Sequence, residues 1–94
     1  MKSAVLDISE KSRLFAALAD ETRLEILNLL ILYPNICVSE IANRLGVSSS
    51  AVSQQCKLLE LSGILRRIRR GQKVCYQIKT EDPDVRKALK LIKE

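Results

Sequence analysis

The chain has 94 residues, which is the size of one domain. Its apolar share of 47% and its charged share of 29% are ordinary for a folded protein, so the composition excludes a disordered chain. The most apolar run, residues 24–33, is shorter than the roughly 20 residues that cross a bilayer, and no charged-then-apolar leader opens the sequence. We therefore expect one cytoplasmic domain over residues 1–94.

The net charge of +5 is unevenly distributed along the chain. Residues 1–47 carry five Lys/Arg against six Asp/Glu, residues 48–79 carry seven against one, and residues 80–94 carry four against four. A polyanion is the natural partner for the middle segment. The alternative is a solvated strand whose Lys and Arg side chains protect a sheet edge, but the concentration in one segment favours the anion.

Two helices are predicted in the first third of the chain. The first covers residues 9–19 with Ser9 as its N-cap, and the second covers residues 21–32 with Asp20 as its N-cap. Apolar residues surround the second helix almost completely, which predicts burial between the core and a second subunit. Pro34 follows it and ends it. The first helix has an apolar face at helical spacing, formed by Leu14, Phe15 and Leu18.

A helix-turn-helix is predicted next. Cys37 stands where a capping residue is expected, with Glu40 three residues on in the capping-box position, and Gly46 closes this third helix. Ser48 caps a fourth helix over residues 49–62. Apolar Val52, Cys56 and Leu59 face the core at helical spacing. This leaves a polar outward face made of Ser49, Ser50, Ser53, Gln54 and Lys57.

A basic hairpin and a last helix complete the chain. Residues 65–70 and 73–78 alternate as two strands with Gly71 in the turn, although their register is left open. Asp82 caps the last helix, with Pro83 in its first turn. This helix has an apolar stripe and no core left to join in so small a domain, so we expect the first and last helices to form a dimer interface. Its expected members are Leu14, Phe15, Leu18, Val85, Ala88, Leu89 and Ile92.

The predicted fold class is mostly α with a small β-hairpin, in the order α-α-α-α-β-β-α of a winged helix-turn-helix. A helix pair that can enter a major groove, beside a cationic hairpin, indicates a DNA-binding protein. We expect the protein not to be an enzyme, because the sequence has no His, no paired carboxylates in an apolar setting and no base beside Cys37. A winged helix that contacts protein or RNA is a further alternative, but its wing would more often be neutral or apolar.

Three segments together resemble the ArsR/SmtB family of bacterial and archaeal repressors, over roughly three-quarters of the chain. They are FAALADETRLEILNLL (15–30), VSEIANRLGVSSSAVSQQCKLLELSGIL (38–65) and RRGQKVCYQI (69–78). The resemblance implies a homodimer that binds a palindromic operator, represses transcription and is released by an inducer. By position, Ser49, Ser50, Ser53 and Gln54 match the groove-facing part of the recognition helix, and Arg69, Arg70, Gln72 and Lys73 match the wing tip.

The sequence departs from the metal-sensing members of that family. Their Cys-x-Cys site at the start of the third helix is reduced here to Cys37-Val38-Ser39. Their site on the last helix uses Asp and His, whereas this chain has Asp82, Asp84 and Glu94 but no His. A stable transition-metal site needs three or four soft or imidazole ligands. We therefore expect no metal and no cofactor.

The three cysteines are odd in number and scattered, without a CxxC pair, so they imply no disulfide framework. Some relatives sense oxidants with a thiol pair, one of which lies near the start of the third helix. Cys37 fits that place, and Cys75 on the wing strand is the candidate partner. We favour the interpretation of all three, Cys56 included, as small buried hydrophobes. A thiol sensor of Cys37 and Cys75, or a regulator without a small effector, remains the alternative.

Overall fold

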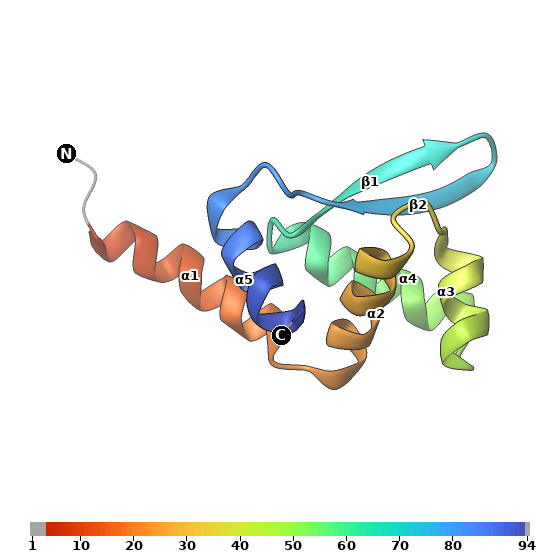
Figure 1. The fold of residues 1–94 in the computed structure, drawn as a ribbon, viewed down its shortest axis with the longest axis horizontal. Coiled ribbons are helices and arrows are strands. Elements are labelled where there is room, and N and C mark those ends of the chain that lie inside the picture. Colours follow the sequence, from red (N-terminus) through yellow and green to blue (C-terminus); the bar gives the residue numbers. More distant parts are fainter. Residues whose placement is uncertain (1–3, 94) are drawn as a thin grey trace.

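The structure is a computed structural model that describes residues 4–93. The described part of the chain forms five helices and one hairpin, in the order that the sequence predicts (Figure 1). The elements are α1 (Ala4–Leu18), α2 (Glu21–Leu32), α3 (Val38–Leu45), α4 (Ser49–Leu61), β1 (Leu65–Arg70), β2 (Lys73–Ile78) and α5 (Pro83–Lys93). This is a winged helix-turn-helix, so the predicted fold class is confirmed.

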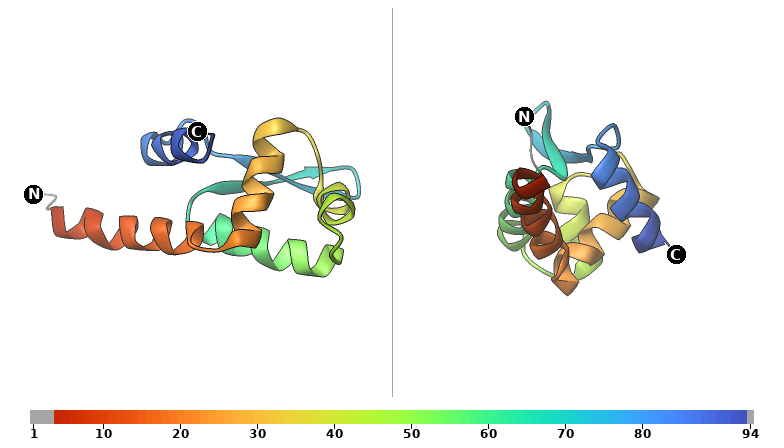
Figure 2. Two further views of the ribbon diagram at one scale, coloured as in Figure 1. Left: turned by 60° about the horizontal axis from the view of Figure 1, so that its bottom comes forward. Right: turned by 90° about the vertical axis from the view of Figure 1, so that its left-hand side faces the viewer.

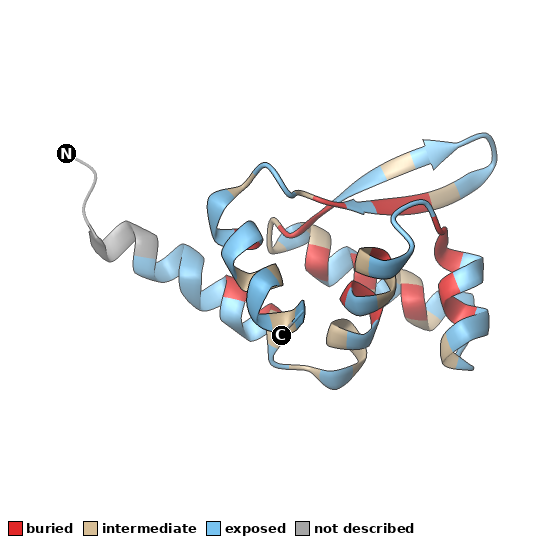
Figure 3. Cartoon of the chain, in the orientation of Figure 1, coloured by how far each residue is buried: buried red, intermediate tan, exposed pale blue. Residues whose placement is uncertain are grey.

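The core lies where α2, α3 and α4 meet under the base of the hairpin. Ile26 and Leu27 of α2, Ile41 of α3 and Leu59 of α4 have no exposed surface. Leu65 closes the core from β1, and Figure 3 shows the buried segments gathered at the centre of the molecule. Removing such side chains from water supplies most of the stabilisation of the fold.

Three of the predicted helix caps, Asp20, Ser48 and Gly46, are in place. The Asp20 carboxylate accepts a hydrogen bond from the backbone N–H of Arg23 at 3.0 Å, at the start of α2. The Ser48 hydroxyl accepts from the backbone N–H of Ala51 at 3.0 Å, at the start of α4. Gly46 ends α3 with φ 69°, a left-handed conformation that glycine adopts without steric cost. Local sequence therefore sets where α2 and α4 begin and where α3 ends.

The hairpin has the register that the sequence left open. Leu65 pairs with Ile78 at its base and Arg70 with Lys73 at its tip. The turn contains only Gly71 and Gln72, and Gly71 has φ 62° whereas no non-glycine residue in the described part has positive φ. This pattern is that of a type II′ turn, whose twist matches the two strands.

Two expectations about the outer helices were wrong. The first helix begins at Ala4, so Ser9 lies inside it and caps nothing. No Gly or Pro occurs in residues 4–8, so nothing in the sequence stops the helix there. Figure 2 shows this end of α1 reaching away from the rest of the molecule.

The second wrong expectation was that the last helix would find no core. Val85 of α5 is only 3% exposed and belongs to the core cluster, with Leu89 and Ile92 packed against that cluster. The helix folds back against α2, which supplies the apolar surface. None of the helices described for residues 4–93 is long and apolar enough to span a bilayer.

Candidate nucleic-acid interface

The core fixes which side of α4 faces outward. Val52, Cys56 and Leu59 are buried against the other helices. The side chains predicted to contact DNA therefore point away from the core. Ser49, Ser50, Gln54 and Lys57 are exposed and Ser53 is half-buried.

A hollow of about 300 Å³ joins the start of α4 to the wing. It is lined by Cys37, Val38, Ser39, Ser49, Ser53, Gln72, Lys73 and Val74. Ser49 and Ser53 come from the predicted recognition helix, and Gln72 and Lys73 come from the predicted wing tip. Residues about 20 positions apart in the sequence thus share one surface, and the wing and α4 can face the same partner.

The basic side chains of the wing differ in their partners. Arg66 forms an ion pair with Glu81 and donates a hydrogen bond to Gln77 at 3.3 Å. Arg70 donates to the side-chain oxygen of Asn35 at 3.1 Å and to its backbone carbonyl at 3.4 Å, so this predicted wing-tip residue ties the hairpin to the loop before α3. Among the described residues, Arg67, Arg69 and Lys73 have no side-chain hydrogen bond or ion pair. These three cations are free to meet an anion.

The cysteines are buried, but two of them are also joined. Cys37 and Cys75 form a disulfide with their Cα atoms 4.1 Å apart, and the same two residues form an isolated antiparallel bridge. Their exposures are 5% and 2%. Our preference for three separate buried thiols did not anticipate this bond. Cys56 is free, and burial raises the pKa of its thiol to about 12, so it stays protonated and unreactive.

The sequence analysis missed the part played by Arg23. Its guanidinium donates to the backbone carbonyl of Ala17 at 2.7 Å, to that of Ala16 at 3.4 Å and to the side-chain oxygen of Gln55 at 2.9 Å. Arg23 therefore connects the end of α1 to the middle of α4, beside Gln54. The sequence signal was that Arg23 is the one basic residue of α2, within the ALADETR run.

An apolar groove of about 540 Å³ lies away from the helix-turn-helix, between α1, α2 and α5. Phe15, Leu18, Ala88 and Ile92, four of the predicted interface residues, line it. Leu14 and Val85 are instead buried in the core of the chain, and the half-buried Leu89 packs against that core outside the groove. Leu91, which we did not predict, also lines the groove.

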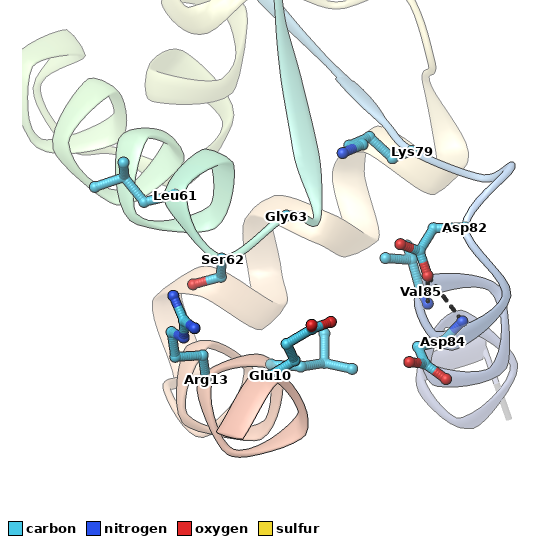
Figure 4. Close-up of a pocket in the computed structure, with 10 residues that line it drawn as sticks. Glu10, Arg13, Leu61, Ser62, Gly63, Lys79, Asp82, Asp84 and Val85 are labelled. Carbon is cyan, nitrogen blue, oxygen red and sulfur yellow. Dashed lines mark hydrogen bonds between the residues drawn. The ribbon is translucent and has the colours of Figure 1, made fainter. Parts of the chain in front are cut away.

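A third cavity, of about 320 Å³, is mainly polar and lies between α1, the end of α4 and the start of α5 (Figure 4). Glu10, Arg13, Lys79 and Asp84 bring charges of both signs to it. Asp82 is occupied with capping, since its carboxylate accepts from the backbone N–H groups of residues 84 and 85 at 2.9 and 3.3 Å. Within residues 4–93, no group of three or more His, Cys, Asp or Glu side chains is placed to hold a metal ion. We assign no ligand to this cavity.

A family model described as winged helix-turn-helix DNA-binding matches residues 20–66, from the cap of α2 to β1. A homologue of the cadmium resistance regulatory protein CadC from Staphylococcus aureus is 33% identical over 70 residues, which are 74% of this chain and 58% of that protein. The arsenical resistance operon repressor of Escherichia coli K12 is 37% identical over 71 residues, which are 76% of this chain and 61% of that protein. The match thus spans about three-fifths of the length of these relatives.

Solved structures agree over almost the whole chain. The homodimeric winged helix-turn-helix domain of a possible ArsR-family regulator from Mycobacterium bovis has a TM-score of 0.85 at 27% identity and covers 99% of this chain and 83% of that one. The transcriptional repressor PagR of Bacillus anthracis has a TM-score of 0.79 at 27% identity, with 94% and 98% covered. The likeness includes α1 and α5, which the family model does not reach.

Proposed function

Since this chain belongs to the ArsR/SmtB family of winged helix-turn-helix regulators, we propose that it is a homodimeric transcriptional repressor that binds double-stranded DNA. The observation that carries the proposal is the hollow at which the polar start of α4 meets the wing tip. A recognition helix and a wing that face the same way are what a winged helix needs to hold one duplex.

Each side chain on this surface has a role in the proposal. The amide of Gln54 can form two hydrogen bonds with an adenine edge in the major groove. Ser49, Ser50 and Ser53 are small enough to let the helix approach the bases. Lys57, Arg69 and Lys73 neutralise phosphates and position the protein without reading sequence. Arg70 and Gln72 support the wing tip, Arg70 through its bonds to Asn35.

Dimerisation follows from the apolar groove of α1, α2 and α5, which a second copy of the chain would cover. In a symmetric dimer the two recognition helices enter successive major grooves about 34 Å apart, so the operator is palindromic. Because the proposed ligand is DNA, we propose that the protein acts in the cytoplasm. We assign it no catalytic activity. Its release from the operator by an inducer is proposed by analogy with the family.

The test is a titration of the purified protein with a fluorescent duplex from its own upstream region and with a scrambled duplex, followed by anisotropy. The wing variant Arg69→Ala/Lys73→Ala should weaken binding to both duplexes and flatten the salt dependence by about 0.9 in log K per log salt for each lost phosphate contact. Gln54→Ala should instead reduce the preference for the natural duplex, with non-specific binding nearly unchanged.

The matched control is Lys90→Ala, which removes an exposed cation from α5, away from this surface. It should leave both the affinity and the salt slope unchanged. If the wing variant kept the full salt slope, the wing would not contact phosphate. If the unaltered protein bound both duplexes equally and weakly, the proposal that it represses transcription from its own upstream region would be contradicted.

A further inference from the structure

We propose that the Cys37–Cys75 disulfide is a reversible link, opened and closed by exchange with small thiols and disulfides, that sets how firmly the wing is held to the helix-turn-helix. The link itself is a property of the fold. Its effect on affinity for DNA rests on the proposed function.

The bond lies at the one place where the wing meets the start of α3. Cys37 is the residue before α3, and Cys75 is in the middle of β2, 38 positions later. The neighbouring attachment is weaker, because it consists of the exposed hydrogen bonds between Arg70 and Asn35. An exposed hydrogen bond contributes about 1 kcal/mol or less to stability. Opening the disulfide would therefore leave the outer half of the hairpin held by these bonds, by the backbone bridge and by Val74, which packs against the core.

The bond is buried, but one of its two residues borders an open hollow. Cys37 lines the hollow between α4 and the wing, whereas Cys75 does not. A local opening of the wing at that hollow would bring a small thiol to the Cys37 sulfur. Cys56 takes no part, because it is enclosed in the core. The environment thus distinguishes the cysteine that borders the hollow, its bonded partner and a thiol enclosed in the core.

Both directions are ordinary thiol–disulfide exchange. A thiolate of a small dithiol attacks the Cys37 sulfur, the bond to Cys75 breaks, and the Cys75 thiolate leaves and takes a proton from water. The second thiol of the reductant then displaces Cys37 and becomes the oxidised cyclic disulfide. In reverse, Cys37 attacks a small disulfide and releases one thiol, and Cys75 then displaces the second. Two protein thiols plus one small disulfide thus give one protein disulfide plus two small thiols.

The closed link favours DNA binding in this arrangement. Ser49 and Ser53 face Gln72 and Lys73 across the hollow, so the contact groups of helix and wing are already aligned while the bond is formed. A loosened wing would have to be ordered on binding, which costs affinity. We expect reduction to weaken duplex binding about five-fold.

The first measurement needs no DNA. Amide hydrogen exchange is followed in the folded protein with and without dithiothreitol, and free thiols are counted by alkylation and mass spectrometry. Reduction should expose two further thiols. It should speed exchange in residues 65–78 by more than the general loss of stability speeds exchange in the core amides of α2. A bond that dithiothreitol does not open in the folded protein, or a hairpin whose exchange rises no more than that of α2, would overturn the proposal whether or not the protein binds DNA.

The second measurement uses a labelled duplex of mixed sequence at low salt, since phosphate contacts do not depend on sequence. The oxidised protein should bind more tightly than the reduced protein, and oxidised glutathione should restore the affinity. Cys37→Ser keeps a capping hydroxyl before α3, and its affinity should equal that of the reduced protein in both conditions. Equal or tighter binding by the reduced protein would overturn the effect on affinity. Absence of binding in both states, with the hairpin still responding, would contradict the proposed function instead.

Discussion

The two sides of this small domain are built in different ways. The side formed by α3, the start of α4 and the wing is polar and cationic, and a disulfide and side-chain hydrogen bonds between elements hold it together. The side of α1 and α5 is apolar, with Phe15 61% and Leu91 74% exposed. The first surface has its parts in place within one chain. The second leaves apolar area in water that a single chain cannot cover.

This difference suggests how the domain divides its work. A surface that must match a duplex benefits from side chains aligned beforehand, because each group that is ordered on binding costs affinity. A surface that joins two identical chains can rely on burial of apolar area, which is not directional. Arg23 lies between the two sides and bonds to both α1 and Gln55 of α4. Changes on each side and at this junction therefore test the comparison.

The largest effect is expected on the apolar side. Leu91→Glu would place a negative charge in the groove of both subunits, which Glu21 and Glu25 already line. Burying an unpaired carboxylate is strongly unfavourable, so the dimer should dissociate with a Kd raised by a factor of about a hundred or more. Analytical ultracentrifugation over a range of concentrations measures this directly.

Lys90→Glu is the control, because it changes the charge of α5 at an exposed residue that does not line the groove. It should leave the dimer intact. Dimers of unchanged strength in Leu91→Glu would mean that the groove is not the contact surface. If the wild-type protein were monomeric at micromolar concentration, the apolar groove would not be a dimer interface.

The next largest effect concerns the covalent tie on the polar side. Opening a disulfide that spans 38 residues frees the unfolded chain, and the loop-closure relation predicts a loss of roughly 2–4 kcal/mol in the free energy of unfolding. The Tm should fall by on the order of 10 °C. Thermal unfolding with and without reductant measures the change. In the double variant Cys37→Ser/Cys75→Ala, reductant should have no effect.

The sequence predicts the polar side better than the apolar side, for a physical reason. Caps and turns depend on residues close in sequence, so Asp20, Ser48 and Gly46 are recognisable from their immediate neighbours alone. The period of the apolar residues likewise predicts which face of α4 is buried. Whether a stripe packs on its own chain or on a partner depends on distant segments. For this reason the sequence analysis named Val85, which is buried in the core of its own chain, and did not name Leu91, which lines the groove.

Contacts between side chains that are far apart in the sequence were the other feature that the sequence did not predict. The resemblance offered Cys37 and Cys75 as a possible pair, but nothing near either residue in the sequence indicates that they meet, because their contact depends on how the hairpin folds over α3. The same holds for Arg23 and Gln55, which are 32 positions apart. The sequence names the residues of the candidate interface as a set, and their role in binding stays a prediction. It does not indicate which of the cations are free and which are hydrogen-bonded or paired to other side chains.

A smaller effect is expected at the junction between the two sides. Arg23→Met keeps much of the aliphatic length but removes the three hydrogen bonds to α1 and α4, and should lower the free energy of unfolding by about 1–3 kcal/mol. A double-mutant cycle with Gln55→Leu should give a coupling of about 1 kcal/mol. Arg13→Met, an exposed arginine with no hydrogen bond in the described structure, is the control and should change stability by less than about 0.5 kcal/mol. A coupling of zero would mean that the two sides fold independently at this point.

The smallest effect is expected at the base of the wing, where Arg66 is paired with Glu81, whereas Arg69 nearer the tip is unpaired in the described structure. The hydrogen bond from Arg66 lowers the pKa of the Glu81 carboxyl from its ordinary value. A lowered pKa in the folded state contributes stability that is present above the unfolded pKa of about 4.3 and is lost as the pH falls through the folded pKa. This contribution should be slight, because the pair is exposed to solvent. Nuclear magnetic resonance titration of the Glu81 carboxyl should show the low pKa, and Arg66→Gln should return it towards normal.

The same variant tests whether pairing removes a cation from the DNA-binding surface. Arg66 is already neutralised by Glu81, so Arg66→Gln should weaken duplex binding less than Arg69→Gln, which removes an unpaired charge of the same kind nearer the tip of the strand. Anisotropy at one low salt concentration compares the two. Equal losses would mean that the wing acts through its total charge. A larger loss for Arg69 would mean that individual phosphate contacts matter, as expected for a surface aligned before binding.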